Sequence, residues 1–186
     1  KDDDGKTPAF DQVVSENLEN IHFTPETVHA AIKQLKLGGA GGPDGFPPRV
    51  FKKLAVCIKD PLSLIFTSFM SVGQLPRDWK HAVVTPVYKS GAASSASNYR
   101  PISLTCVACK LMERVIVKQT LGFLRKHGVI NAHQHGFLSG RSTTTNLLES
   151  VNDWTLAIND RKSVGAAYID YVCVNYTRTI LNCILC

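Results

Sequence analysis

The residues from Gly38 to Gly45 constrain the fold of this chain more than any other stretch, because five of these eight residues are glycine and one is proline. Glycine has no Cβ atom and loses more conformational freedom on folding than any other residue, so such a run is a poor helix and a poor strand. We therefore predict a loop here that bends sharply or passes close to another segment.

Helices are predicted on both sides of this loop. Thr24 is a helix-capping residue, and Pro25 suits the first helical position. Apolar residues then follow at helical spacing from Val28 to Leu35, and the first glycines of the loop end that helix. A second helix is predicted over residues 47–72, with a break or a restart at Pro61.

Two strands and two helices are predicted after residue 80. Residues 82–88 are rich in valine and predict a strand, which Pro86 makes an edge strand or a bend. Residues 89–97 form a loop of small residues, which we expect to be mobile. Helical patterns cover residues 107–127 and 142–158. The nearly unbroken apolar run over residues 164–170 predicts a central strand with an acid at its exit.

Composition limits the class of protein. The chain has 186 residues, of which 44% are hydrophobic and 19% are charged, as in soluble globular proteins. Lys59, Asp60 and Pro61 interrupt the most apolar stretch, so we expect no membrane span. Six cysteines are too few for a disulfide scaffold, which favours an intracellular location, nuclear or cytoplasmic.

Charge is concentrated in the middle of the chain. Residues 49–141 contain 14 Lys and Arg against three Asp and Glu, a net charge of +11, whereas residues 1–48 sum to −4 and residues 142–186 to −1. A basic surface of this kind is typical of proteins that bind phosphates, although a solvated basic face gives the same count.

Six short motifs follow one another along the chain. In chain order they are Gly42–Gly45, Leu75–Pro76 with Trp79–Lys80, Pro86 with Lys89, Asn98–Leu104, Lys110 with Glu113–Arg114, and Gln134–Phe137 with Arg141–Ser142. Taken together, these motifs resemble the reverse transcriptases of non-LTR, LINE-type retrotransposons. The resemblance covers residues 24–171, which leaves residues 1–23 as an N-terminal linker or tail and residues 172–186 as a tail that does not match. It implies an α+β fold, namely the mainly helical fingers region of a right-hand polymerase with the first palm strand and an incomplete palm.

The resemblance also implies roles for basic and polar residues. Triphosphate contacts are implied for Lys89, Arg100 and Lys110. Contacts to nucleic acid are implied for Arg114, Lys118, Gln134, Gly136 and Arg141. Chemistry supports these roles, because a guanidinium group pairs well with phosphate and three cations at four-residue steps share one helical face. A solvated helix face remains the alternative for Arg114 and Lys118, and we expect Phe137 to be a core residue and the histidines at 133 and 135 to lie in a solvated loop.

Asp170 is the catalytic candidate. The resemblance makes it the first carboxylate of a palm that holds Mg2+ for phosphoryl transfer on an RNA template and a DNA primer. Such chemistry needs a second carboxylate element, and the adjacent aspartates of this chain lie only at residues 2–4. We therefore expect an incomplete metal site, no polymerisation by this chain alone, and self-association through the uncovered palm strand.

Two alternatives stay open. The pairs Cys106 with Cys109 and Cys183 with Cys186 have zinc-ligand spacing, but the distance between the pairs is long for a compact zinc site. The chain could also be a domesticated module that binds nucleic acid or protein without enzymatic activity.

Overall fold

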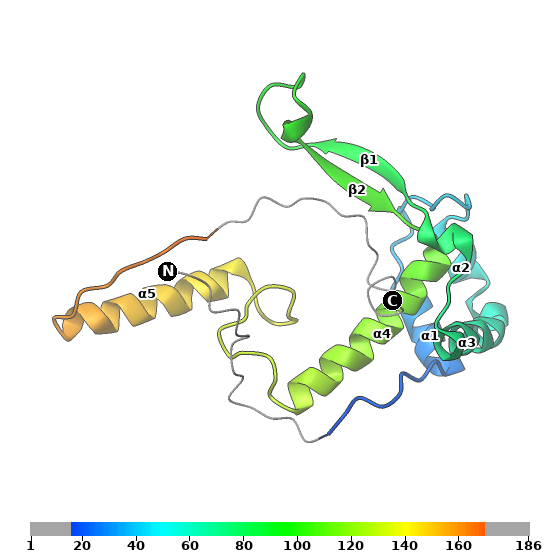
Figure 1. The fold of residues 1–186 in the computed structure, drawn as a ribbon, viewed down its shortest axis with the longest axis horizontal. Coiled ribbons are helices and arrows are strands. Elements are labelled where there is room, and N and C mark those ends of the chain that lie inside the picture. Colours follow the sequence, from blue (N-terminus) through cyan, green and yellow to red (C-terminus); the bar gives the residue numbers. More distant parts are fainter. Residues whose placement is uncertain (1–15, 170–186) are drawn as a thin grey trace, which may run out of the picture. The chain divides into compact units, whose positions relative to one another are not determined.

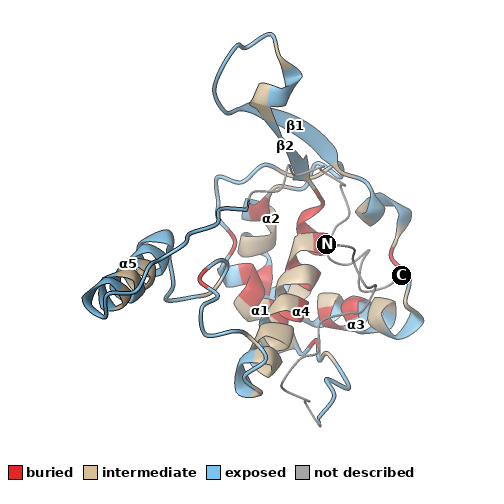
Figure 2. Ribbon diagram, turned by 60° about the vertical axis from the view of Figure 1, so that its left-hand side comes forward, coloured by how far each residue is buried: buried red, intermediate tan, exposed pale blue. Residues whose placement is uncertain are grey.

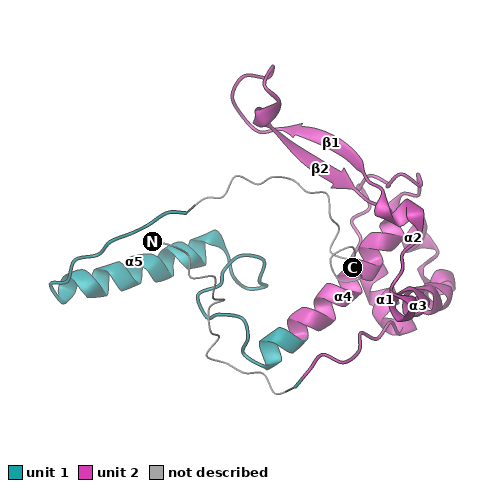
Figure 3. Ribbon diagram, viewed as in Figure 1, with its two compact units in different colours: residues 1–16, 123–173 teal, residues 17–122, 174–186 magenta. Residues whose placement is uncertain are grey.

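The computed structural model of the protein describes residues 16–169 (Figure 1). These residues form two compact units, which have separate colours in Figure 3. Residues 17–122 make up the larger unit, and residues 123–169 together with Glu16 make up the smaller unit. The boundary between the units falls inside the longest helix of the described chain.

The described chain is mainly helical with one small sheet, in agreement with the predicted α+β class. The α-helices are α1 (Pro25–Lys33), α2 (Pro48–Lys53), α3 (Ala55–Val72), α4 (Val107–Lys126) and α5 (Thr143–Asn159). The strands are β1 (Val83–Tyr88) and β2 (Tyr99–Leu104). Two short 3-10 helices, η1 (Arg77–Lys80) and η2 (Ala96–Asn98), precede the two strands.

Helix α1 begins where the sequence predicts. The Thr24 side chain accepts a hydrogen bond from the Thr27 amide at 3.2 Å, and Pro25 occupies the first helical position. The helix ends at Lys33, however, before the glycines that we expected to stop it. Gly38 and Gly39 are therefore not needed to end α1.

Helices α2 and α3 correct the prediction of a break at Pro61. The chain leaves helical geometry at Leu54, between the two helices, and Pro61 lies inside α3. Proline has no amide hydrogen, so Pro61, the seventh residue of α3, removes one intrahelical hydrogen bond, to the Cys57 carbonyl, but the helix continues through it. Gly73 ends α3 in the left-handed conformation, with φ 68°, as the sequence predicts.

The core of the larger unit forms where α1, α3 and α4 pack together (Figure 2). Phe66 of α3 is fully buried, with its ring 5.6 Å from the ring of Phe23 and 6.0 Å from that of Trp79. The buried face of α4 includes Leu111 and Met112. Because Phe23 is a core residue, the packed region begins before residue 24, where the resemblance to reverse transcriptases begins.

The glycine-rich loop passes against the start of α4, as its composition predicts. A Cβ atom placed on Gly42 would lie 2.5 Å from the amide nitrogen of Cys106. No side chain fits at that distance, so the loop approaches the helix by backbone contact. Gly45 turns the loop away with φ 71°, in the left-handed region.

Strands β1 and β2 form an antiparallel hairpin that extends away from the helices of the larger unit (Figure 1). The strands pair from Val83 with Leu104 to Tyr88 with Tyr99. The sequence predicts β1 but not β2, because Pro101 lies in the middle of β2. In a two-stranded sheet both strands are edges, so a proline is tolerated in each.

The smaller unit contains α5 and the loops that flank it. Ser142 and Thr145 form a reciprocal capping box at the start of α5, where the sequence predicts a helix. The strand predicted over residues 164–170 is wrong for residues 164–169, which are irregular and exposed. A strand needs a neighbour for its backbone hydrogen bonds, and no other strand of residues 16–169 pairs with this segment. The expected self-association through this segment stays a prediction.

Helix α3 is the one helix among residues 16–169 that is long and apolar enough to cross a membrane, with a mean hydropathy of 1.4 over 18 residues. Core helices of globular proteins can have the same length and composition. Ser63 and Phe66 of α3 are in the core, and Lys59 and Asp60 form an ion pair at 3.7 Å within the helix. The absence of a membrane partner stays a prediction.

Candidate nucleic-acid interface

The hairpin places two of the predicted triphosphate ligands on one face. Arg100 pairs with Val87 in the register, and the Lys89 amide donates to the Asn98 carbonyl at 2.8 Å, which continues the ladder by one step. Side chains two positions apart along a strand point to the same side. Lys89 and Arg100 therefore share a face of the hairpin, and both are exposed.

Aromatic side chains organise the opposite face and the tip of the hairpin. The rings of Tyr88 and Tyr99 pack edge to face, with their centroids 5.5 Å apart. The Tyr88 hydroxyl donates to the Gly91 carbonyl, and the Tyr99 hydroxyl donates to the Ala93 carbonyl at 2.9 Å. Asn98 also donates to the Ala92 carbonyl at 2.8 Å. The small-residue loop, which we expected to be mobile, is thus tied back to both strands.

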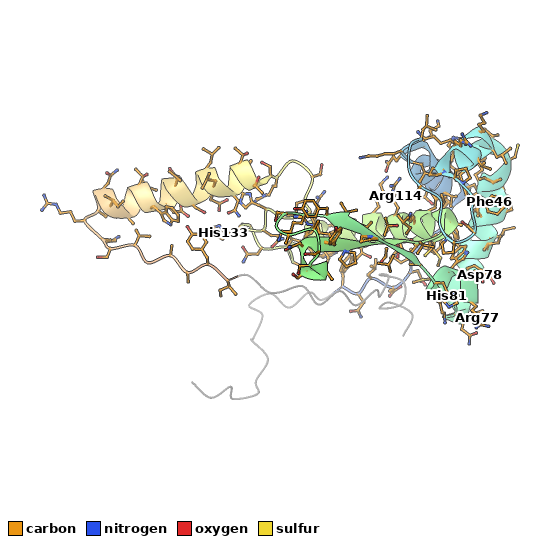
Figure 4. All side chains as sticks on the ribbon, turned by 90° about the horizontal axis from the view of Figure 1, so that it is seen from above. Phe46, Arg77, Asp78, His81, Arg114 and His133 are labelled. Carbon is orange, nitrogen blue, oxygen red and sulfur yellow. The ribbon has the colours of Figure 1, made fainter. Side chains whose placement is uncertain are left out.

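Helix α4 presents the three predicted cations with different degrees of exposure. Lys110 and Arg114 are half-buried, and Lys118 is exposed. Arg114 points toward α1 (Figure 4) and donates from Nη1 to the Ala31 carbonyl at 3.2 Å. The ion pairs formed within residues 16–169 involve none of these three cations. Arg114 therefore combines a structural hydrogen bond with a charge that retains further donors.

A small pocket lies beside Arg114, between α1 and α4. It has a volume of about 170 Å3 and is lined mainly by apolar atoms. Arg114 and Lys118 both line it, whereas Lys110 does not. The three cations predicted to share one face of α4 are therefore divided between two places. Arg114 and Lys118 line the pocket, and Lys110 lies outside its lining.

The smaller unit contains the other predicted nucleic-acid ligands, which are all exposed. Gln134 donates from its side chain to the Gly136 carbonyl at 3.0 Å, which tightens the turn between them. Arg141 donates from Nη1 to the Ala132 carbonyl and lies 3.4 Å from His135 Nε2. Arg141 therefore links two parts of this loop through Nη1, and its other guanidinium nitrogens make no hydrogen bond within residues 16–169, so they can donate to a phosphate.

Two histidines of the same loop bind one carboxylate, which the sequence analysis missed. His135 is 8% exposed and holds Glu149 of α5 at 2.6 Å and Thr145 at 2.8 Å. His133, labelled in Figure 4, binds the other carboxylate oxygen of Glu149. Hydrogen bonds from His135 and His133 lower the pKa of Glu149 from its ordinary value. The prediction that both histidines lie in a solvated loop is wrong for His135.

Phe137 corrects a second prediction for this loop. Its side chain is fully exposed rather than in the core, and its backbone has φ 62°, in the left-handed region. A phenylalanine rarely adopts that conformation without a constraint from its surroundings. The hydrogen bonds of Gln134, His135 and Arg141 on either side of it supply that constraint.

The structure offers no support for metal binding in the part of the chain that it describes. Residues 16–169 contain no group of three or more His, Cys, Asp or Glu side chains that could hold a metal ion. Asp170, the ligand for Mg2+ that the resemblance implies, lies outside these residues. The described residues therefore do not fit a Mg2+ site, and Mg2+ stays a prediction that depends on Asp170.

The first cysteine pair has a packing role. Cys106 and Cys109 are buried as free thiols at the start of α4, and their Sγ atoms lie 3.7 Å and 3.9 Å from the carbonyl oxygens of Asp78 and Trp79 in η1. Burial raises the pKa of Cys109 to about 12, so at neutral pH the group is a protonated thiol that packs as a small apolar side chain. The second pair, Cys183 and Cys186, lies outside the described residues.

Comparison with known proteins identifies relatives over most of the chain. The chain is 31% identical over 146 residues to the probable RNA-directed DNA polymerase from transposon BS of Drosophila melanogaster. It is also 31% identical over 148 residues to the RNA-directed DNA polymerase from mobile element jockey of the same organism. The chain is a relative of the RNA-directed DNA polymerases of non-LTR retrotransposons.

These matches cover most of the chain but little of each relative. They include 78% and 79% of the chain, and in both cases 16% of the relative. A third match, at 26% identity over 110 residues, is the probable polymerase from transposon X-element of Drosophila melanogaster. No family model matches the chain. The resemblance seen in the six motifs is therefore confirmed, and the chain corresponds to about one sixth of the length of such a polymerase.

Proposed function

We propose that residues 24–171 form the fingers region and the start of the palm of a reverse transcriptase, which binds an RNA template, a DNA primer and the incoming triphosphate. The observation that carries this proposal is the hairpin, where Lys89 and Arg100 share one exposed face. A guanidinium and an ammonium group on adjacent strands suit the several negative charges of a triphosphate. Arg114, which is half-buried, and Lys118, which is exposed, supply further phosphate contacts beside α1.

The charge of the chain supports binding that does not depend on sequence. The +11 net charge of residues 49–141 predicts association with RNA and DNA in the micromolar range, with an affinity that falls steeply as salt rises. Each cation that contacts a phosphate contributes about one unit to the slope of log affinity against log salt concentration.

Salt titration of single variants tests this proposal. Arg100→Gln and Lys89→Gln should each lower the slope for a short single-stranded RNA by about one unit. Lys53→Gln is the matched control, because Lys53 is an exposed cation at the end of α2 and loses the same charge. A wild-type affinity that does not change with salt would contradict the proposal, and so would equal slopes for Arg100→Gln and Lys53→Gln.

We further propose that this chain by itself does not extend a primer. Asp170 is its one residue that resembles a palm metal ligand, and two-metal phosphoryl transfer needs carboxylates from more than one element. Primer extension on an RNA template with Mg2+ or Mn2+ should therefore be absent. Template-dependent extension that disappears in Asp170→Ala would refute this part of the proposal while leaving the binding role intact.

A further inference from the structure

The pocket between α1 and α4 has the chemistry of a site for one ring of a ligand. Its floor is made by Ala30 and Ala31 of α1 and by Val115 of α4. Its volume of about 170 Å3 is close to that of an engineered apolar cavity of about 150 Å3 that holds one benzene molecule. The pocket is therefore too small for a drug-sized ligand and large enough for a single planar group.

Cations flank this apolar floor. Arg114 is fixed in place because Nη1 donates to the Ala31 carbonyl, which leaves the rest of its guanidinium group available. Lys118 is exposed one turn further along α4. Neither cation forms an ion pair with a carboxylate within residues 16–169. A ligand that places a ring on the floor can thus present an anion to both cations.

One amide at the edge of the pocket can recognise a polar ring. Gln34 caps the end of α1, and its exposed side-chain amide makes no hydrogen bond within residues 16–169. Gln119 lines the same pocket, but its amide is engaged in two hydrogen bonds with the backbone of His22, at 2.9 Å and 2.8 Å. The Gln119 side chain is therefore held in place by His22. The Gln34 side chain can donate one hydrogen bond and accept another at the polar edge of a bound ring.

A second cavity of the larger unit lacks this combination. It lies between residues 18–21, α3 and α4 and has a volume of about 500 Å3. Glu19 is the charged side chain among its lining residues. A carboxylate repels phosphate, so this larger cavity does not suit a nucleotide.

We propose that the pocket between α1 and α4 takes one unpaired base of a single-stranded nucleic acid, with the phosphates on either side of the base paired with Arg114 and Lys118. Flipped bases bind in protein pockets by stacking on apolar side chains and by hydrogen bonds to their polar edges, which Ala30, Val115 and Gln34 provide here. This proposal rests on the proposed binding of nucleic acid. That binding requires contacts to phosphate alone, and the pocket adds a contact to a base.

Strands with and without bases test the proposal. The probes are an eight-residue oligothymidylate and an abasic strand of the same length and charge, both measured by fluorescence anisotropy at 50 mM salt. Contact with the apolar lining removes one face of a base from water, so the wild-type protein should bind the oligothymidylate about tenfold more tightly than the abasic strand. Equal affinity for the two strands would overturn the pocket proposal alone, and no binding of either strand would overturn the proposed function with it.

Two variants separate the base contact from the phosphate contact. Ala30→Leu fills the floor and should remove the preference for the oligothymidylate without changing the affinity for the abasic strand. Lys118→Gln should weaken both strands by the same factor. Ala157→Leu is the matched control, because Ala157 is a half-exposed alanine on α5 with the same change in volume. A preference that survives in Ala30→Leu would refute the assignment of the base to this pocket.

A spectroscopic measurement keeps the proposal testable if Ala30→Leu does not fold. A strand with one 2-aminopurine among thymidines should become protected from acrylamide quenching when it binds the wild-type protein. Gln34→Ala, an exposed substitution at the end of α1, should reduce that protection. Full accessibility of 2-aminopurine in the bound strand would overturn the proposal.

Discussion

Gly42 approaches the backbone of Cys106 so closely that a Cβ atom on Gly42 would lie 2.5 Å from the Cys106 amide nitrogen. The two residues are 64 positions apart in the sequence, at the centre of a loop and at the start of α4. Gly42 does not have a positive φ, so the absence of a side chain, rather than an unusual backbone conformation, is what this position requires. The contact joins the glycine-rich loop to the helix that presents Arg114 and Lys118.

Gly42→Ala should destabilise the larger unit by about 1–3 kcal/mol, the usual cost of inserting an atom into a packed region. The neighbours of the new Cβ atom are backbone atoms of Thr105 and Cys106, which cannot rotate away. Urea denaturation followed by circular dichroism measures the change. Gly38→Ala is the control, because no atom lies within 4 Å of its Cβ position and alanine there should be neutral or stabilising by up to about 1 kcal/mol. Equal stability of the two variants would show that the loop can move away from α4.

Local signals in the sequence predicted most of the helices. Thr24, Gly73 and Ser142 mark the ends of α1, α3 and α5 through contacts with residues a few positions away. Strand β2 and the irregular conformation of residues 164–169 depend on distant pairing partners, which a pattern of one segment does not contain. Local capping is therefore readable from a single sequence, and strand pairing is not.

The same distinction holds for the candidate interface. The resemblance to reverse transcriptases pointed to Lys89 and Arg100, and the resemblance together with a four-residue spacing pointed to Arg114 and Lys118. The pairing of β1 with β2 was needed to place the first two on one face, and the packing of α1 on α4 was needed to find the pocket beside the last two. A single signal could have drawn attention to Glu149, namely its helical spacing of four from Thr145, but nothing in the sequence links it to two histidines of a loop.

The buried thiol of Cys109 should make stability fall at high pH. Burial, with a smaller effect of Glu113, raises the pKa of this thiol to about 12, against an ordinary value of 9.0. Above pH 9 the unfolded chain loses the proton while the folded chain keeps it, so the free energy of unfolding decreases as pH rises from 9 toward 12. Cys109→Ala should show a flatter decrease over this range in denaturation experiments, and Cys57→Ala, at an exposed cysteine, should not. The same slope in wild type and Cys109→Ala would contradict the raised pKa.

Glu149 should make the loop of the smaller unit sensitive to acid. Hydrogen bonds from His135 first and from His133 second lower the pKa of Glu149 below its ordinary value of 4.5. The stabilisation is therefore present above pH 4.5 and is lost as pH falls through the lower value in the folded state. Other groups face this cluster: Arg141 lies 3.4 Å from His135, and Thr145 binds the same ring. The protection factors of the amides of residues 131–141 in hydrogen exchange, corrected for the intrinsic exchange rate at each pH, should fall as the pH drops below 4.5.

Substitution of Glu149 distinguishes the effect of this carboxylate from a general loss of stability in acid. Glu149→Gln removes the titrating carboxylate, so the protection of the loop should be lower at pH 6 and should change little between pH 5 and pH 3. Asp153→Asn is the control, because Asp153 is an exposed acid on the same helix. An acid response that is equal in Glu149→Gln and Asp153→Asn would show that the two histidines do not stabilise the loop through this carboxylate.

Helix α5 should cause the isolated chain to bind hydrophobic dyes. No residue of this helix is buried, and its exposed fractions reach 60% for Leu147, 65% for Leu148 and 65% for Ile158. Neighbouring apolar side chains on a helix surface form a patch that attracts dyes and other chains. The double substitution Leu147→Gln and Leu148→Gln keeps good helix formers and should lower both the fluorescence of bound ANS and the apparent mass in sedimentation experiments. Thr144→Gln is the control on the same helix, and ANS fluorescence that is the same in the double variant as in wild type would place the dye-binding surface elsewhere.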